Sequence, residues 1–375
     1  MKKFMLLATA VGMTLTSCVN DEEATMMDTR SVIAFDAPAL KTSRANVLGE
    51  ISGVKYPTTE NFKVFCKIYS GNYKGWTTSE GIVDYFKVAG DEAKHEGGTY
   101  WSTETVYYWP DAGYNLAFAA YSPAVLGDAC KAADGFEGTK ITRTAAGIQI
   151  TDFVSEESSD HQYDLMYSHT VYDRNKSNNA SSAVSLQFEH ALSSIVFSSQ
   201  KSDANVDYEI IDLVVGGDFH VKGNFTQGIT STTNGAGDYT ETENPVWDLQ
   251  GRTATPVNYD PTFTAFDVPD ASPEIFTQGS SAILAIPQPV PANATVTVTY
   301  TKTSNGTTTT HTAAIKLLDF KKAAVDASAV AEGITTWERG KRYVYRIAFG
   351  ENKRIYFEPS ITDWVQEPTL IYTIN

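Results

Sequence analysis

Three features of the sequence predict an all-β fold. Apolar and polar residues alternate with a period of two over 62–69, 82–88, 115–121, 208–215 and 295–300. Turn-forming residues separate these runs at short intervals, and only residues 321–332 follow a helical pattern. Because alternation is the pattern of a strand with one buried face, we expect a β-sandwich architecture.

The beginning of the chain predicts export as a lipoprotein. Two lysines precede an apolar stretch that ends at Met13 and is too short for a permanent membrane span. Leu15 and two small residues then lead to Cys18, an order similar to the bacterial lipobox, in which the cysteine is acylated. We therefore expect a lipoprotein signal peptide over 1–17 and lipidation at Cys18. An ordinary secretory signal that contains a cysteine is the alternative.

The segment after Cys18 concerns the location of the protein, and the overall charge concerns its partners. The run Asn20-Asp21-Glu22-Glu23 resembles the export signal of lipoproteins that reach the surface of the outer membrane, although such an acidic run also suits a plain solvated linker. The chain of 375 residues has a net charge of −16 and no basic cluster. Nucleic acid is excluded as a partner, because a phosphate backbone is held by clustered Lys and Arg.

The remaining cysteines permit at most one disulfide. Cys66 alternates with Phe62 and Val64 on one strand face, which predicts a buried, unreactive thiol. Pairing of Cys66 with Cys130 stays open.

The chain is expected to divide into two domains. Residues 173–182 are polar and lack large apolar side chains, which indicates a linker. We place the boundary there, giving domains 45–180 and 181–375. Within the second domain, residues 228–244 are expected to form an exposed loop. Asn305-Gly306 predicts a tight hairpin, and a second hairpin is expected to turn at 350–352.

No motif points to catalysis. The sequence lacks a nucleophile elbow, a phosphate-binding glycine loop and a paired-histidine metal motif. The densest titratable group, Asp91, Glu92, His95 and Glu96, suits a solvated loop better than a metal site. His169 is expected to be structural. We expect no enzyme activity, no catalytic residue, no cofactor and no metal.

Several short stretches, taken together, resemble the fimbrillin family of Bacteroidales. They follow the family's order along the chain: Tyr107-Tyr108-Trp109-Pro110, 116–123, Asp164-Leu165-Met166, 184–192 with Leu186, Phe188, His190 and Leu192, 337–345, and Ile361-Thr362-Asp363-Trp364. We expect the apolar residues of these stretches to pack in a core. His190 is expected to be a structural histidine whose hydrogen bonds are satisfied.

The resemblance implies a fold and an assembly route. It implies two transthyretin-like β-sandwich domains in tandem, lipoprotein export, and assembly into surface fimbriae (pili) after an arginine-specific protease removes an N-terminal strand. The vacated position would accept a strand from another fimbrial subunit, and such head-to-tail contact builds a filament.

This chain has residues that suit each step of that route. Residues 18–44 would form the lipidated tether and removable strand, with Val32, Ile33 and Phe35 in the strand. We expect cleavage between Arg44 and Ala45. Arg30 is the alternative, although a cut there would leave the strand in place.

The C-terminal segment 369–374 is the candidate donor strand. Its apolar residues are Leu370, Ile371, Tyr372 and Ile374. The same segment also suits the subunit's own last strand, so stalk, anchor and tip roles stay open, as does binding of a host or bacterial surface ligand.

The alternative function is that of a monomeric surface glycan-binding lipoprotein. It would use exposed aromatic residues near Trp101 and Trp109, although packing in a core is the favoured role for these side chains.

Overall fold

The computed structural model describes residues 31–36, 56–127, 140–159, 162–179, 183–234, 238–249, 254–270, 272–320, 333–350 and 356–363. Nearly all regular structure in these ranges is β-strand, which confirms the predicted all-β class. The four short helices are η1 (Ala124–Gly127), α1 (Lys176–Asn179), η3 (Gly279–Ser281) and η4 (Leu317–Asp319). No helix within these ranges is long and apolar enough to cross a membrane.

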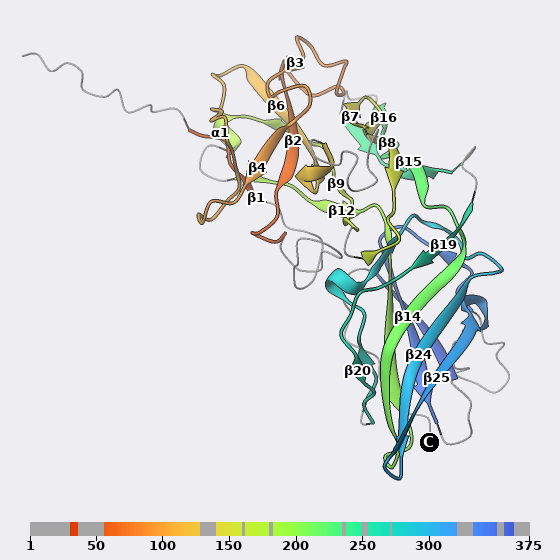
Figure 1. The fold of residues 1–375 in the computed structure, drawn as a ribbon. Coiled ribbons are helices and arrows are strands. Elements are labelled where there is room, and N and C mark those ends of the chain that lie inside the picture. The colour runs from red at the N-terminus through yellow and green to blue at the C-terminus, as the bar shows by residue number, and fades with distance from the viewer. Residues whose placement is uncertain are drawn as a thin grey trace, which may run out of the picture.

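Two sheets build the upper part of the molecule in Figure 1. The larger has eight strands: β2 (Phe62–Ser70), β3 (Val83–Asp84), β4 (Asp91–Lys94), β5 (Ser102–Thr103), β6 (Tyr114–Ser122), β9 (Met166–Ser168), β10 (Val171–Arg174) and β12 (Phe188–His190). The second has β7 (Lys140–Thr144), β8 (Gly147–Val154), β15 (Lys222–Thr226) and β18 (Val246–Asp248). We call them the central sheet and the covering sheet.

Two further sheets build the lower part. One has β13 (Ser193–Lys201), β21 (Glu274–Ile275), β22 (Ile283–Ala285), β27 (Lys341–Phe349) and β28 (Tyr356–Asp363). The other has β14 (Asp207–Phe219), β19 (Thr255–Tyr259), β20 (Phe266–Asp267), β24 (Thr295–Ser304) and β25 (Thr307–Lys316). Three small pairs complete the fold: β1 (Phe35–Asp36) with β11 (Val184–Ser185), β16 (Thr230–Thr233) with β17 (Tyr239–Thr242), and β23 (Gln288–Pro289) with β26 (Thr336–Trp337).

The central sheet is buried on both faces. On β2, Phe62, Val64 and Cys66 enter one aromatic core, while Phe65 and Tyr69 enter another, shared with the covering sheet. The first set confirms the predicted alternation around Cys66. Burial raises the pKa of the Cys66 thiol well above its ordinary value, as expected for an inert buried cysteine. Cys130 lies outside the described residues, so the pairing question stays open.

The lower sheets enclose a third core. Trp337 is fully buried there, stacks on Phe219 at 5.2 Å and donates from Nε1 to the Tyr345 hydroxyl at 3.0 Å. The register of β14 shifts between Ile210 and Asp212, which lets side chains on both halves of this long strand face the core.

The strand pairing confirms the first predicted hairpin, and for the second it shows antiparallel flanking strands, while residues 351–352 of the predicted turn lie outside the described residues. Asn305 and Gly306 have φ of 51° and 75° and connect β24 to β25, as a type I′ turn requires. Strands β27 and β28 pair antiparallel across the second expected turn.

The prediction of an exposed loop over 228–244 is wrong. This stretch contains the hairpin β16–β17, and the ring of Tyr239 packs on Tyr73 of the upper part at 5.1 Å. Strands β16 and β17 show no alternation of apolar and polar residues, so the local sequence did not predict strands there. The boundary near residue 180 stays a prediction, as does the transthyretin-like arrangement. The helical pattern at 321–332 lies outside the described residues.

Candidate functional site

The N-terminal segment 31–36 lies in a groove between two stretches of the upper part. On one side it runs antiparallel to residues 101–109. The Ile33 N–H donates to the Tyr107 carbonyl at 2.9 Å, and Trp109 N–H donates to the Ser31 carbonyl at 3.0 Å. Phe35 exchanges two hydrogen bonds with Trp101, of 2.9 and 3.0 Å. The segment is therefore bound by backbone hydrogen bonds as a strand and does not merely lie on the surface.

The other side of the segment pairs with β11. The N–H groups of Val184 and Leu186 donate to the carbonyls of Ala34 and Asp36 at 2.8 and 2.7 Å. This pairing is parallel, with Phe35 opposite Val184. Hydrogen bonds on both edges make the segment an inner strand, although it is only six residues long.

The side chains of the segment alternate between core and solvent. Ile33 and Phe35 are buried at 1% and 0% exposure, whereas Val32 is 49% exposed. The Phe35 ring meets Phe62, Phe86 and Phe118 edge-on, with centroids 6.2, 6.3 and 5.6 Å away. Edge-to-face contacts of this kind stabilise beyond simple burial. The groove thus has two apolar sites spaced two residues apart.

Loss of the segment would leave a defined vacancy. Four N–H groups (Trp101, Trp109, Val184, Leu186) and two carbonyls (Trp101, Tyr107) would lose their partners. A buried unpaired backbone group costs ~1–3 kcal/mol, and the empty Phe35 site would expose aromatic rings. Such a groove favours refilling by another strand.

Most of the site residues predicted from sequence lie outside the described ranges. These are Cys18, Arg30, Arg44, Ala45, Leu370, Ile371, Tyr372 and Ile374. Val32, Ile33 and Phe35 are described and lie together in the groove. The sequence did not predict that 101–109 and 184–186 pair with this segment, because no local pattern indicates which strands pair when they are far apart in the chain.

The aromatic residues considered for glycan stacking belong to the core. Trp101 and Trp109 are each 4% exposed, and Trp101 Nε1 donates to the Glu60 carbonyl at 3.1 Å. Both tryptophans belong to the stretch that borders the groove, and because they are buried they offer no stacking surface to a sugar.

The candidate acidic cluster is held by other interactions. Asp91 is 2% exposed, pairs with Lys87 Nζ at 2.9 Å and accepts from the Tyr107 hydroxyl at 2.9 Å. Among the described residues, no group of three or more His, Cys, Asp or Glu is arranged to hold a metal ion.

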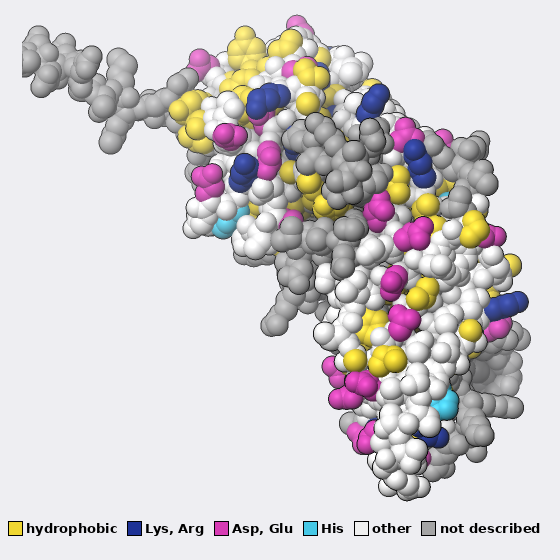
Figure 2. All heavy atoms as spheres, viewed as in Figure 1, with side chains coloured by type: hydrophobic (Ala, Val, Ile, Leu, Met, Phe, Trp, Pro, Cys, Tyr) yellow, Lys and Arg dark blue, Asp and Glu magenta, His cyan; other side chains and the backbone are white. Residues whose placement is uncertain are grey.

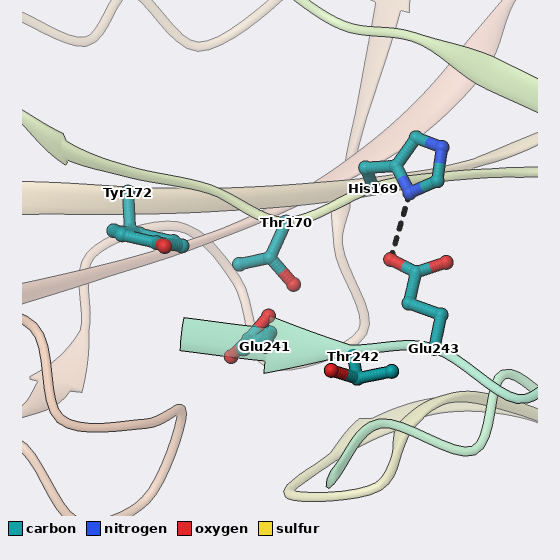
Figure 3. Close-up of a pocket in the computed structure, with 6 residues that line it drawn as sticks. All are labelled: His169, Thr170, Tyr172, Glu241, Thr242 and Glu243. Atoms are coloured by element: carbon teal, nitrogen blue, oxygen red, sulfur yellow. Dashed lines mark ion pairs between the residues drawn. The ribbon is translucent and has the colours of Figure 1, made fainter. Parts of the chain in front are cut away.

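A second site surrounds His169, beside a cleft of about 430 Å³ that is also lined by Thr170, Tyr172, Glu241, Thr242 and Glu243 (Figure 3). His169 Nδ1 lies 2.8 Å from Glu243, and Nε2 lies 3.1 Å from Glu189. Arg339, from the turn before β27, pairs with Glu189 at 2.7 Å. This chain of charges joins the central sheet, the stretch after β17 and the lower part.

The charges in this network stabilise each other. Hydrogen bonds to Glu189 and Glu243 raise the pKa of His169 to about 10. The hydrogen bond from His169 lowers the pKa of Glu189 to about 2. Both ring nitrogens face carboxylates, so His169 is an imidazolium that donates on both sides. As expected from sequence, it has a structural role. His190 does too, with Nδ1 2.9 Å from Asp164.

The geometry defines a class of protein: an all-β chain whose N-terminal segment completes the core of its central sheet. A family model described as fimbrillin-like matches residues 60–364, so the chain belongs to the fimbrillin-like family. A comparison with curated proteins found no match.

One solved structure shows the same fold. A fimbrial protein from Bacteroides vulgatus is 17% identical, with a TM-score of 0.52 over 89% of this chain and 100% of that protein. Candidate cell adhesion proteins from Bacteroides uniformis and Bacteroides ovatus are 12% and 14% identical, each with a TM-score of 0.44. They cover 89% and 90% of this chain, and 98% and 99% of their own.

The groove predicts that Phe35 anchors the N-terminal segment. Phe35→Ala should lower the free energy of unfolding by ~3–5 kcal/mol, because it removes a fully buried ring and leaves a cavity. Urea denaturation measures this. Val32→Ala, at a half-exposed position of the same segment, is the matched control and should stay within ~0.5 kcal/mol. Equal effects of the two changes would mean that the segment is not held by Phe35.

The charge network predicts a pH dependence of stability. The pKa of His169 is raised from 6.5 to about 10, so its stabilisation is present below pH 6.5 and is lost as pH rises through 10. The pKa of Glu189 is lowered from 4.5 to about 2, so its contribution is present above pH 4.5 and is lost as pH falls through 2.

Thermal unfolding measured from pH 6 to pH 10 tests the histidine. The unchanged protein should lose stability across this range, and His169→Gln should show a flatter profile. His311→Gln, on the exposed strand β25, is the control and should follow the unchanged protein. A profile of His169→Gln as steep as that of the unchanged protein would contradict the assignment.

Proposed function

We propose that this protein is a structural or adhesive subunit of bacterial surface fimbriae. In this proposal it is exported as an outer membrane lipoprotein on Cys18, cut after Arg44 by an arginine-specific protease, and joined to other subunits by strand exchange. The observation that carries the proposal is the segment 31–36, which is held only by noncovalent contacts inside an apolar groove. Membership of the fimbrillin-like family supports it.

The position of the segment favours Arg44 over Arg30 as the processing site. The described groove-filling residues, 31–36, all precede Arg44 and follow Arg30. A cut after Arg44 separates them from the rest of the chain, so the segment can leave. A cut after Arg30 keeps the segment joined to residue 37 onward, and the groove stays filled.

The candidate donor strand has a spacing that suits the groove. Ile33 and Phe35 occupy apolar sites two residues apart. In the C-terminal segment, Leu370, Tyr372 and Ile374 also alternate. A strand entering from another subunit would restore backbone bonds to the groove walls and place apolar side chains in the two sites. Because the donor strand of one subunit would fill the groove of the next, repeated exchange would build an open filament.

Controlled proteolysis tests the proposal. The purified mature chain is treated with an arginine-specific protease, the new N-terminus is sequenced, and the products are sized by chromatography and viewed by electron microscopy. We expect one dominant cut that creates an N-terminus at Ala45, followed by release of the segment and formation of oligomers or filaments.

Two matched variants sharpen the test. Arg44→Ala should stay uncut at this position and monomeric, whereas Arg30→Ala should be processed like the unchanged chain. Scattered cleavage, or a chain cut after Arg44 that keeps segment 31–36 and stays monomeric, would contradict strand exchange as the assembly route.

A further inference from the structure

Strand β25 forms an open edge at the lower end of the molecule (Figure 1). It is the last strand in the order β19-β14-β24-β25 and pairs only with β24 among the described residues. Its register with β24 runs through ten consecutive pairs, from Thr295 opposite Lys316 to Ser304 opposite Thr307, with no shift. The edge is therefore long and regular.

The edge lacks the features that keep other edges from pairing. Natural edge strands are blunted by charge, proline, bulges or short length. In this chain β28 contains Glu358 and Pro359, β19 contains Pro256, and β5 and β21 have two residues each. Strand β25 reads Thr-Thr-Thr-Thr-His-Thr-Ala-Ala-Ile-Lys, with no proline and no acid.

The backbone of β25 presents free hydrogen-bonding groups outward. In a two-residue hairpin, the pair beside the turn is hydrogen-bonded and the pattern then alternates. Thr307 and Thr309 therefore face β24, while the N–H and C=O groups of Thr308, Thr310 and Thr312 point away from it. Side chains from Thr307 to Thr312 are all exposed, so nothing in the described structure covers them.

Charge does not oppose a second copy of the chain at this edge. The net charge is −16, yet no Asp or Glu occurs between Glu274 and Asp319. Figure 2 shows mostly uncharged surface at the lower end of the molecule. In a β25–β25 pair, the acid-bearing β14 strands of two copies would lie five strand spacings apart, about 24 Å. That exceeds the screening length of about 8 Å at physiological salt, so repulsion between them is small.

The side chains also favour a matching strand over an apolar one. The outward face carries threonines, and Thr303 Oγ1 contacts Thr308 Oγ1 at 2.8 Å. It offers no apolar site like that of Phe35, so the C-terminal segment would gain little here. Threonine pairs across strands are favourable, and an antiparallel pair of identical strands is self-complementary.

We propose that β25 pairs antiparallel with β25 of a second copy, forming a two-fold symmetric contact. The contact is independent of the groove, so in the proposed fimbriae it would join neighbouring filaments side by side. One strand pair buries little surface and gives a weak contact. Repetition along two filaments would strengthen it by avidity.

The test uses the full chain with Arg44→Ala, which keeps the proposed strand exchange out of the measurement. Sedimentation velocity over a concentration series should show a monomer–dimer equilibrium that changes little with added salt, because the acid-bearing strands of the two copies lie farther apart than the screening length. A chain that stays monomeric to ~1 mM would overturn the proposal, because even a contact worth only about −4 kcal/mol would give dimers there.

Two variants at one position locate the contact. Thr310→Glu should weaken dimerisation ~10-fold or more, because symmetry brings the two new charges together. Thr310→Pro removes an outward N–H that β24 does not use, and should weaken it similarly. The control Thr232→Glu adds the same charge to exposed β16 and should leave the equilibrium unchanged. Dimerisation that survives both changes at Thr310 would refute the β25 contact.

Hydrogen exchange on the Arg44→Ala chain provides a measurement that does not depend on variants at the contact. The amides of Thr308, Thr310 and Thr312 should gain protection as the protein concentration rises. Protection that is already complete at low concentration would mean that the edge is covered within one chain, which would also overturn the proposal.

Discussion

The structure depends on one constraint: the central sheet is apolar on both faces, and both must be covered. Strands β2 and β6 send side chains in both directions, so a single packed layer cannot satisfy them. The covering sheet, β7–β8–β15–β18, buries one face. On the other face, the short segment 31–36 supplies Ile33 and Phe35 to an aromatic cluster. A short segment thus covers a core that a longer element usually covers.

This constraint connects stability with the proposed assembly. In the proposed assembly, a segment that completes a core but lies outside the larger sheets can be exchanged without rebuilding them. The groove walls belong to 101–109 and β11, which stay attached to the domain. Their backbone groups favour any strand that offers the same bonds and two correctly spaced apolar side chains. The requirement for a covered face is then met by another subunit rather than by the same chain.

One of the connections between the upper and lower parts is where β12 runs into β13. Glu189 of β12 binds both His169 and Arg339, and the Gly340 N–H donates to the Leu192 carbonyl at 2.8 Å. Charged and backbone bonds therefore reinforce a connection of only two residues between these strands. Such a joint suits a subunit whose proposed contacts, the groove and β25, lie in different parts of the molecule.

The sequence by itself determined features that depend on neighbouring residues. Alternation placed β2, β6, β14 and β24, and Asn305-Gly306 specified its turn, because these signals act within a few residues. Only the tertiary structure decided which distant strands meet. It placed segment 31–36 against Trp101 and Val184, buried tryptophans that could have been exposed, and made a hairpin of 228–244. Strand partners are chosen by the total area that the whole chain can bury, and no short stretch of sequence contains that information.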